Sequence, residues 1–163
     1  MIVHASLITR RQAGRWRGVL IEGTSGAGKS DLALRAIDAG WALVADDRTL
    51  VWVSGGRLFG RAPSQLAGLI EARGVGVVAS AARDFAAIDL AVTCAPLGKV
   101  ERMPEFQTYE RLGVAIPKIA LTACEASAPA KLAIALSHLG LLTQPAYQAC
   151  RAVAPLLTAG GDP

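Results

Sequence analysis

The sequence is poor in cysteine and in aromatic residues, and it has no apolar run long enough to span a membrane. Only three of its 163 residues are cysteines, and they lie far apart. Their odd number and wide spacing exclude a disulfide framework and a C-x-x-C zinc site. We expect Cys94, Cys124 and Cys150 each to be a small buried apolar residue in a reducing compartment. The start of the chain also lacks the pattern of a secretory signal. These absences predict a cytoplasmic protein without membrane segments.

Neither positive nor negative charge is in large excess. The chain has 17 basic and 13 acidic residues, a net charge of +4. So small an excess favours phosphate groups or an acidic partner surface over nucleic acid. Hydrophobic residues make up 52% and aromatic residues 5%, a mixture rich in Ala, Val and Leu that suits the buried strands of an α/β domain. We expect one domain over residues 1–163.

Apolar patterning in the first half predicts strands around one clear helix. The helix is indicated by Leu32, Ala33, Ala36 and Ile37 at helical spacing, with Gly40 as its stop signal. A short second helix is predicted to begin at Pro63 and run through residue 70. The strands are predicted at residues 19–21, 42–44, 50–53, 57–59, 75–78 and 86–93.

The second half is less regular. Residues 99–113 are polar and contain Pro104, which predicts a long surface loop. Residues 114–121 predict a strand, and Pro117 within it indicates an edge position because proline cannot donate to a sheet. Residues 131–142 and 147–157 predict two closing helices, followed by a frayed tail.

The strongest motif is G-x-x-x-x-G-K-S, which lies between the first strand and the first helix. A loop of this kind turns backbone N–H groups toward phosphate, and the following helix adds its positive end. Lys29 would neutralise the β- and γ-phosphates of a nucleoside triphosphate, and the Ser30 hydroxyl would ligate Mg²⁺. We expect Lys29 to be exposed, so that folding hardly depends on it. The loop consists of Gly23, Thr24, Ser25, Gly26, Ala27, Gly28, Lys29 and Ser30.

Other candidate residues are less specific taken one at a time. Asp46 and Asp47 follow the strand after the helix, and adjacent residues on an extended chain point to opposite sides. One could face the γ-phosphate as a base or Mg²⁺ partner while the other orients a neighbour. Glu71 could ligate Mg²⁺ or form a surface pair with Arg73. Arg111 could stabilise a transferring phosphoryl group or be solvated. A histidine such as His4 is more often structural.

Taken together and in this order, the motifs resemble the catalytic domain of HPr kinase/phosphorylase. The similarity covers about residues 1 to 136 and rests on several short segments with matching order and spacing. These are His4, the loop from Gly23 to Ser30, Val44-Ala45-Asp46-Asp47, Gly60-Arg61-Ala62-Pro63, Ile70-Glu71-Ala72-Arg73-Gly74-Val75-Gly76, Arg111-Leu112-Gly113 and Pro117-Lys118-Ile119.

The resemblance implies a P-loop sheet with flanking helices, related to that of phosphoenolpyruvate carboxykinase. It implies that ATP and Mg²⁺ are used to phosphorylate a serine of HPr or a similar phosphocarrier, by a homo-oligomer that is a hexamer in the family. Asp46 matches the family's base in phosphorylation and its acid in dephosphorylation. His4, Lys29 and Arg111 match other active-site positions, and Ser30 and Glu71 match the Mg²⁺ ligands.

Two departures from the family are visible. Its members carry an additional N-terminal domain, so we expect a short form without it. They also carry a Gly-Arg-Asn segment used in dephosphorylation, where this chain has Ser127-Ala128-Pro129-Ala130-Lys131. We therefore expect phosphorylation with weak or absent phosphorylase activity. A P-loop kinase or NTPase acting on a small molecule and a non-catalytic nucleotide-dependent regulator are the alternatives.

Overall fold

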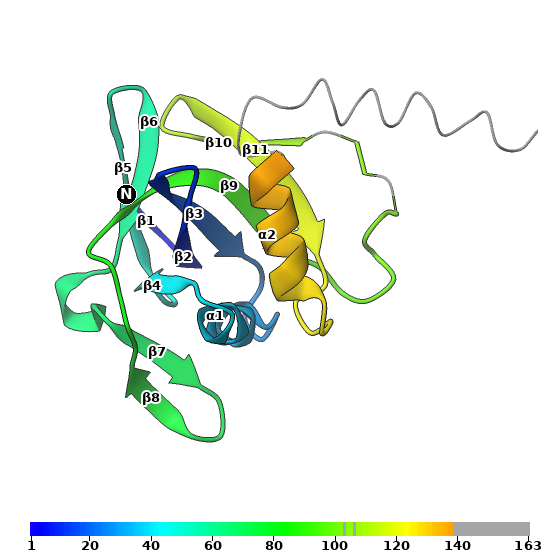
Figure 1. Ribbon diagram of the computed structural model, residues 1–163, viewed down its shortest axis with the longest axis horizontal. Helices are drawn as coiled ribbons and strands as arrows, with labels where there is room; N and C mark the ends of the chain where they lie inside the picture. The colour runs from blue at the N-terminus through cyan, green and yellow to red at the C-terminus, as the bar shows by residue number, and fades with distance from the viewer. Residues whose placement is uncertain (103, 106, 139–163) are drawn as a thin grey trace, which may run out of the picture.

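A computed structural model describes residues 1–102, 104–105 and 107–138. Its centre is a nine-stranded sheet in the order β1-β5-β6-β9-β3-β2-β4, with β11 and then β10 added beside β9. A separate two-stranded sheet joins β7 to β8 (Figure 1). The strands of the large sheet are β1 (Ile2–Val3), β2 (Ala5–Gln12), β3 (Arg15–Glu22), β4 (Ala42–Ala45), β5 (Thr49–Ser54), β6 (Arg57–Arg61), β9 (Ala86–Cys94), β10 (Gln107–Arg111) and β11 (Val114–Leu121). The remaining elements are β7 (Leu69–Ala72), β8 (Gly76–Ala79), the α-helices α1 (Lys29–Asp38) and α2 (Ala128–His138), and the 3₁₀ helix η1 (Ser64–Leu66).

Strand β9 organises the large sheet because it has different partners along its length. One side pairs in parallel with β3. The other side pairs antiparallel with β6 at Ala86 and Ala87, and then in parallel with β11 from Ala91 to Cys94. The sheet therefore divides and curls along β9. Because β3 and β9 are parallel, both end at the same edge, and the glycine-rich loop leaves β3 there.

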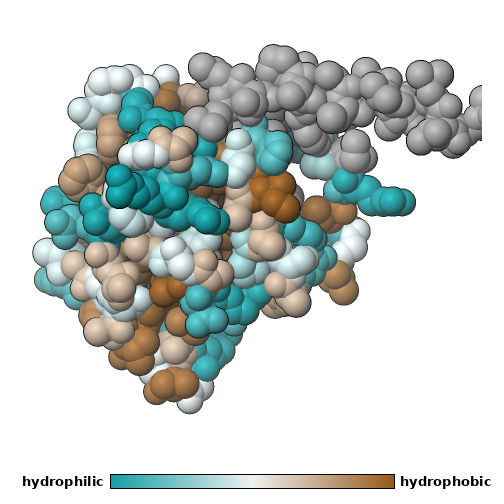
Figure 2. All heavy atoms as spheres, in the orientation of Figure 1, coloured by the Kyte–Doolittle hydropathy of each residue, from teal (hydrophilic) through white to brown (hydrophobic). Residues whose placement is uncertain are grey.

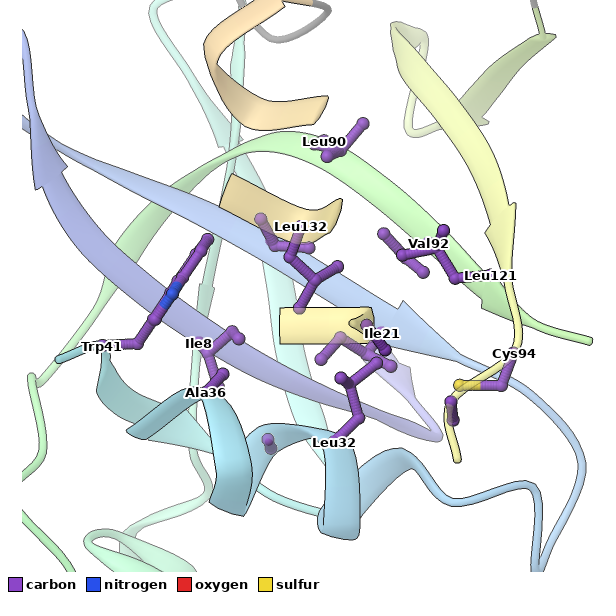
Figure 3. Packing of buried hydrophobic residues seen from close by; sticks show 14 of the residues in the cluster. Ile8, Ile21, Leu32, Ala36, Trp41, Leu90, Val92, Cys94, Leu121 and Leu132 are labelled. Carbon is purple, nitrogen blue, oxygen red and sulfur yellow. The ribbon is translucent and has the colours of Figure 1, made fainter. Parts of the chain in front are cut away.

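The hydrophobic core forms two clusters on the two faces of this sheet. Helices α1 and α2 cover one face, where Leu32 and Leu132 pack against Ile8, Ile21 and Val92 (Figure 3). The second cluster joins β2 and β3 to the curled part of the sheet, and it includes Leu7, Leu20, Val51, Leu58, Ile88, Tyr109 and Ile116. The predicted α/β fold with helices flanking the P-loop sheet is confirmed, and the sheet is mixed rather than parallel throughout.

One arginine of the basic N-terminal region lies inside the fold. The Arg17 side chain is fully buried, its Nε donates to Asp89 at 3.1 Å, and its Nη1 donates to the carbonyl of Leu136 at 2.8 Å. Burial lowers the pKa of Arg17, while the hydrogen bond and the charge of Asp89 raise it. Arg17 thus joins the sheet to the end of α2 and is not available to a partner.

Several predicted elements need correction. The helix predicted from Pro63 to residue 70 is only η1, because Leu69 starts β7 and Ile70 buries its side chain in the core. The predicted strand at 75–78 exists as β8, which pairs with β7. The loop predicted at 99–113 contains β10, in which only Tyr109 is buried.

Strand β11 is not at an edge, because it lies between β10 and β9. Pro117 stands opposite Thr108, and the pairing with β9 begins one residue later, at Lys118. The first closing helix begins at Ala128 rather than at residue 131, and α2 is described as far as His138. The predictions for residues 139–163, including the second closing helix and Cys150, lie outside the described residues. Among the helices that are described, none has the length and apolar character needed to cross a membrane.

Candidate functional site

The loop from Gly23 to Ser30 connects the end of β3 to the start of α1. Gly28 forms the N-terminal cap of α1 with φ of +89°, a left-handed conformation that side chains other than glycine rarely adopt. A Cβ atom on Gly28 would also lie 3.1 Å from the Cβ of Ala123. Glycine is therefore needed here so that the first N–H groups of α1 face the loop.

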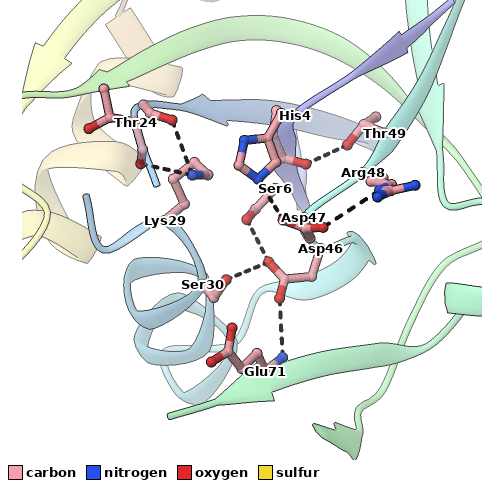
Figure 4. Close-up of polar contacts among 12 residues, drawn as sticks. His4, Ser6, Thr24, Lys29, Ser30, Asp46, Asp47, Arg48, Thr49 and Glu71 are labelled. Carbon is pink, nitrogen blue, oxygen red and sulfur yellow. Dashed lines mark hydrogen bonds and ion pairs between the residues drawn. The ribbon is translucent and has the colours of Figure 1, made fainter. Parts of the chain in front are cut away.

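Lys29 is folded back over the loop. It is buried, so the prediction that it is exposed is wrong. Its side chain is buried, and Nζ donates to the carbonyl oxygens of Gly23 and Thr24, each at 3.1 Å. The ammonium group is thus held among the turns of the loop that would surround a phosphate (Figure 4). This arrangement places a positive charge in the cradle before any ligand arrives.

Asp46 is buried beneath the loop and serves as a common acceptor. One carboxylate oxygen accepts from the Ser6 hydroxyl at 2.6 Å and the Ser30 hydroxyl at 2.9 Å, and the other accepts from the Glu71 backbone N–H at 3.1 Å. The carboxylate therefore joins β2, α1 and β7 (Figure 4). Sequence reasoning missed Ser6, because a single serine inside an apolar strand carries no motif.

Asp47 faces the opposite way and is exposed. Its φ of +62° is left-handed, which aspartate tolerates better than most residues do. The turn directs its carboxylate to His4, whose Nε2 lies 2.5 Å from Oδ1 and donates to it, and Arg48 lies 3.8 Å from the other oxygen. The two adjacent carboxylates thus have separate surroundings, as expected, although the cause is a turn and not an extended strand.

These residues meet at a cavity of about 420 Å³. Of the predicted site residues, His4, Ser25, Gly26, Gly28, Lys29, Ser30, Asp47 and Glu71 line it. Asp31, Leu34, Ala72, Arg73, Val75 and Cys124 line it as well, and sequence reasoning had placed none of these in the site. For Arg73 and Val75 the available signal was their position next to Glu71 in a glycine-containing turn.

The two described cysteines lie on either side of the loop. Cys94 is buried against Gly23, and burial raises the pKa of its thiol to about 11. Cys124 is exposed and borders the cavity, so the prediction that it is buried is wrong. The turn after β11 brings it out beside Gly28.

Two predicted catalytic residues do not line this cavity. Asp46 lies beneath it, and Arg111 lies at the end of β10, where its guanidinium carbon is 4.7 Å from the centre of the Tyr109 ring. The Tyr109 hydroxyl donates to Glu22 at 2.7 Å. Burial, and then this hydrogen bond, raise the pKa of Tyr109 above its usual range. Arg111 is therefore connected through Tyr109 to the residue that precedes the phosphate loop.

The oxygen donors at the cavity fit a magnesium ion that is bound together with phosphate. Among the described residues, no group of three His, Cys, Asp or Glu side chains could hold a metal by itself. Mg²⁺ normally takes only one or two protein ligands and completes its shell with phosphate and water oxygens. The Ser30 hydroxyl and the half-exposed Glu71 carboxylate, both on this cavity, are donors of that kind.

Comparison with known proteins gives a consistent result. Residues 3–151 match the family described as HPr Serine kinase C-terminal domain. The chain is 39% identical over 105 residues to an HPr kinase/phosphorylase of Brevibacillus brevis, which covers 60% of this chain and 32% of the relative. It is 38% identical over 120 residues to an HPr kinase/phosphorylase of Streptococcus pneumoniae, which covers 63% of this chain and 37% of the relative. The matched region is thus about a third of the length of these relatives.

A solved structure of similar size also matches. The structure of the HPr(Ser) kinase/phosphatase from Coxiella burnetii is 25% identical in sequence, with a TM-score of 0.73. The match covers 93% of this chain and 97% of that one. The overall arrangement described above is therefore shared along nearly the whole of both chains.

Proposed function

This chain belongs to the HPr serine kinase C-terminal domain family, and we propose that it transfers the γ-phosphoryl group of ATP to a serine of HPr or of a similar phosphocarrier. The observation that carries the proposal is the cavity at which the phosphate loop meets the His4–Asp47 pair. Phosphoryl transfer needs a phosphate cradle, a cation, a metal and a proton acceptor. The residues at this cavity supply the cradle, Lys29, ligands for the metal, and Asp47.

We assign the proton acceptor to Asp47 rather than to Asp46. The Asp47 carboxylate lines the cavity and is exposed, whereas Asp46 already accepts three hydrogen bonds below it. The serine oxygen would attack the γ-phosphorus and pass its proton to Asp47 while the bond to the β–γ bridging oxygen breaks and ADP leaves. His4 would hold Asp47 in place by donating a hydrogen bond from Nε2 to the Asp47 Oδ1.

Lys29 would neutralise the phosphates in the cradle, and Ser30 and Glu71 would hold Mg²⁺. The metal, when bound, withdraws negative charge from the β- and γ-phosphate oxygens. The Ser30 hydroxyl donates its hydrogen to Asp46 at 2.9 Å, and this hydrogen bond leaves the oxygen lone pairs free to face the ion. Asp46 would thus orient a ligand rather than react itself.

The test is incubation with ATP labelled at the γ-phosphate, Mg²⁺ and purified HPr. We expect label in a phosphoserine of HPr, and transfer slower by about a hundredfold or more with Asp47→Asn. ADP release without labelled HPr would instead indicate an NTPase or a small-molecule kinase. Nucleotide binding without ADP release would indicate a non-catalytic regulator.

We further propose that the reverse reaction is weak. Pro129 lies in the first turn of α2, where proline is tolerated, and Lys131 is paired with Glu125. Lys131 is the only basic residue of the segment 127–131, and its pairing with Glu125 leaves no unpaired cation there for an incoming phosphate. Phospho-HPr incubated with inorganic phosphate should lose its label slowly, with little pyrophosphate formed. A rate similar to that of phosphorylation would refute this part of the proposal.

A further inference from the structure

The β7–β8 hairpin extends away from the main sheet and has two different faces. Its strands pair with each other and with no other described strand. Ile70 stands opposite Val78, and both pack toward the core cluster under α1. Glu71 stands opposite Val77, so these two side chains share the other face. Figure 1 shows the hairpin projecting at the lower end of the molecule.

The outer face of this hairpin carries two valines that no described residue covers. Val75 is 80% exposed and Val77 is 66% exposed, although valine is usually buried. The two residues are two positions apart at the turn and the start of β8. Figure 2 shows hydrophobic side chains at this lower end of the molecule. A group of exposed apolar side chains beside a cavity is typical of an interaction site.

The same face continues into the candidate active site. Glu71, Arg73 and Val75 line the phosphate cavity. The Arg73 side chain is 79% exposed, and its Nε lies 3.8 Å from the Glu71 carboxylate. The hairpin forms one side of the cavity, and a protein that presents a serine there can approach along it. It would meet a cation and two valines within one short hairpin.

We propose that this hairpin face, defined by Arg73, Val75 and Val77, docks the protein that carries the acceptor serine. The inference rests on the proposed function and adds to it the chemistry of the partner. The partner would place an apolar patch on the valines and a carboxylate on Arg73. Arginine is enriched among the residues that carry the binding energy of protein interfaces.

The hairpin is positioned for this role by the buried carboxylate below it. Asp46 accepts from both the Ser30 hydroxyl and the Glu71 N–H. The docking face and the phosphate loop are therefore held by one group, which sets the distance from a docked partner to the phosphate. A partner bound here would bring its serine to a cradle that is already in register.

The test compares Val77→Ser with wild type, using HPr as the acceptor. Val77 is exposed and does not line the cavity, so the variant should fold normally. We expect its KM for HPr to rise about tenfold while its KM for ATP and kcat stay unchanged. The separate variant Val77→Ile keeps an apolar branched side chain, so its KM for HPr should equal that of wild type. Val53→Ser changes a valine of the distant β5–β6 hairpin that is 38% exposed, and it serves as the matched control.

Three results would overturn the proposal. One is an unchanged KM for HPr, and another is an equal rise in the KM for ATP, which would make the hairpin part of the nucleotide site. The third is a change in molecular mass by light scattering, which would make the face a contact between copies of the chain. Calorimetric binding of HPr in the presence of a non-hydrolysable ATP analogue separates docking from catalysis. If wild type binds HPr more tightly than Val77→Ser but transfers no phosphate, docking stands and the proposed function fails.

Discussion

Exchanging each of the two adjacent aspartates for asparagine should affect two different properties of the protein. Asp47 is exposed and bonded to His4, so Asp47→Asn should change the free energy of unfolding by less than about 0.5 kcal/mol. An amide cannot accept the serine proton, and loss of a general base typically slows transfer by roughly 10²–10⁴-fold. Binding of ATP should be nearly unchanged, because the phosphate loop is intact.

Asp46 should behave in the opposite way. Its side chain accepts from Ser6, Ser30 and the Glu71 N–H. In Asp46→Asn the amide can donate to both hydroxyls and accept from the N–H. The expected loss is then the charge assistance alone, about 1 kcal/mol. Asp46→Ala leaves one buried donor (Ser6) and two partly buried donors without an acceptor, and we expect it to lower the free energy of unfolding by about 2 kcal/mol or more.

Urea unfolding gives the stability term, and transfer of label from ATP to HPr gives the rate. We expect Asp46→Asn to keep its transfer rate within about tenfold of wild type, since its role is positional. The reasoning is refuted if Asp46→Asn loses transfer while binding ATP normally and Asp47→Asn remains near the wild-type rate. In that case Asp46, as the family resemblance implied, is the base.

The remaining predictions concern Lys29, Gly18 and the two described cysteines. Lys29→Ala should abolish transfer and lower the free energy of unfolding by about 1 kcal/mol, because two loop carbonyls lose their donor; full stability would show that the buried ammonium is dispensable for folding. Gly18→Ala places a Cβ 2.6 Å from the Ala87 carbonyl oxygen, and urea unfolding should show a loss of about 2 kcal/mol, because backbone atoms cannot rotate away. A maleimide at pH 8 should label Cys124 but not Cys94 in peptide mass spectra, and ATP should slow the labelling; equal labelling of both would contradict their placement. Burial raises the pKa of Cys94 from 9.0 to about 11. Its contribution to stability is therefore complete below pH 9 and is lost as the pH rises toward 11. Cys94→Ala should make the free energy of unfolding depend less on pH between these two values.

The phosphate loop could be predicted because its information is local. The glycines, the strand before them and the helix after them lie within a short stretch, and each specifies backbone geometry where it stands. The structure places β3 before the loop and starts α1 at Lys29. The conformation of Gly28 is therefore a property of that sequence and depends little on distant residues. The folded-back position of Lys29 depends on loop carbonyls and could not be read from spacing.

Strands that owe their stability to a partner were harder to predict. Residues Gln107–Arg111 are polar, and only Tyr109 is buried, so no alternation of apolar residues announces β10. The strand exists because β11 supplies its hydrogen-bond partners. The first half of β7, Leu69 and Ile70, is predicted as the end of a helix for a related reason. Its four residues are too few to show a period, and its pairing with β8 becomes visible only in three dimensions.

The separation of the two aspartates shows where sequence reasoning about the site had to stop. The sequence alone does not show which of two adjacent aspartates is the base. A motif match assigns a role to a position, but it gives no information about the groups around that position. The left-handed turn at Asp47 makes the distinction, by directing one carboxylate to His4 at the cavity and leaving the other under Ser30. The two are still coupled, because Asp46 holds Ser30 and the strand that carries Glu71, while Asp47 lines the cavity in which we propose that those two residues hold Mg²⁺ and phosphate. A buried acid that orients the ligands and an exposed acid that takes the proton are consistent with the site as a whole. Exchanging the two roles would require a buried carboxylate that already accepts three hydrogen bonds to take the serine proton as well.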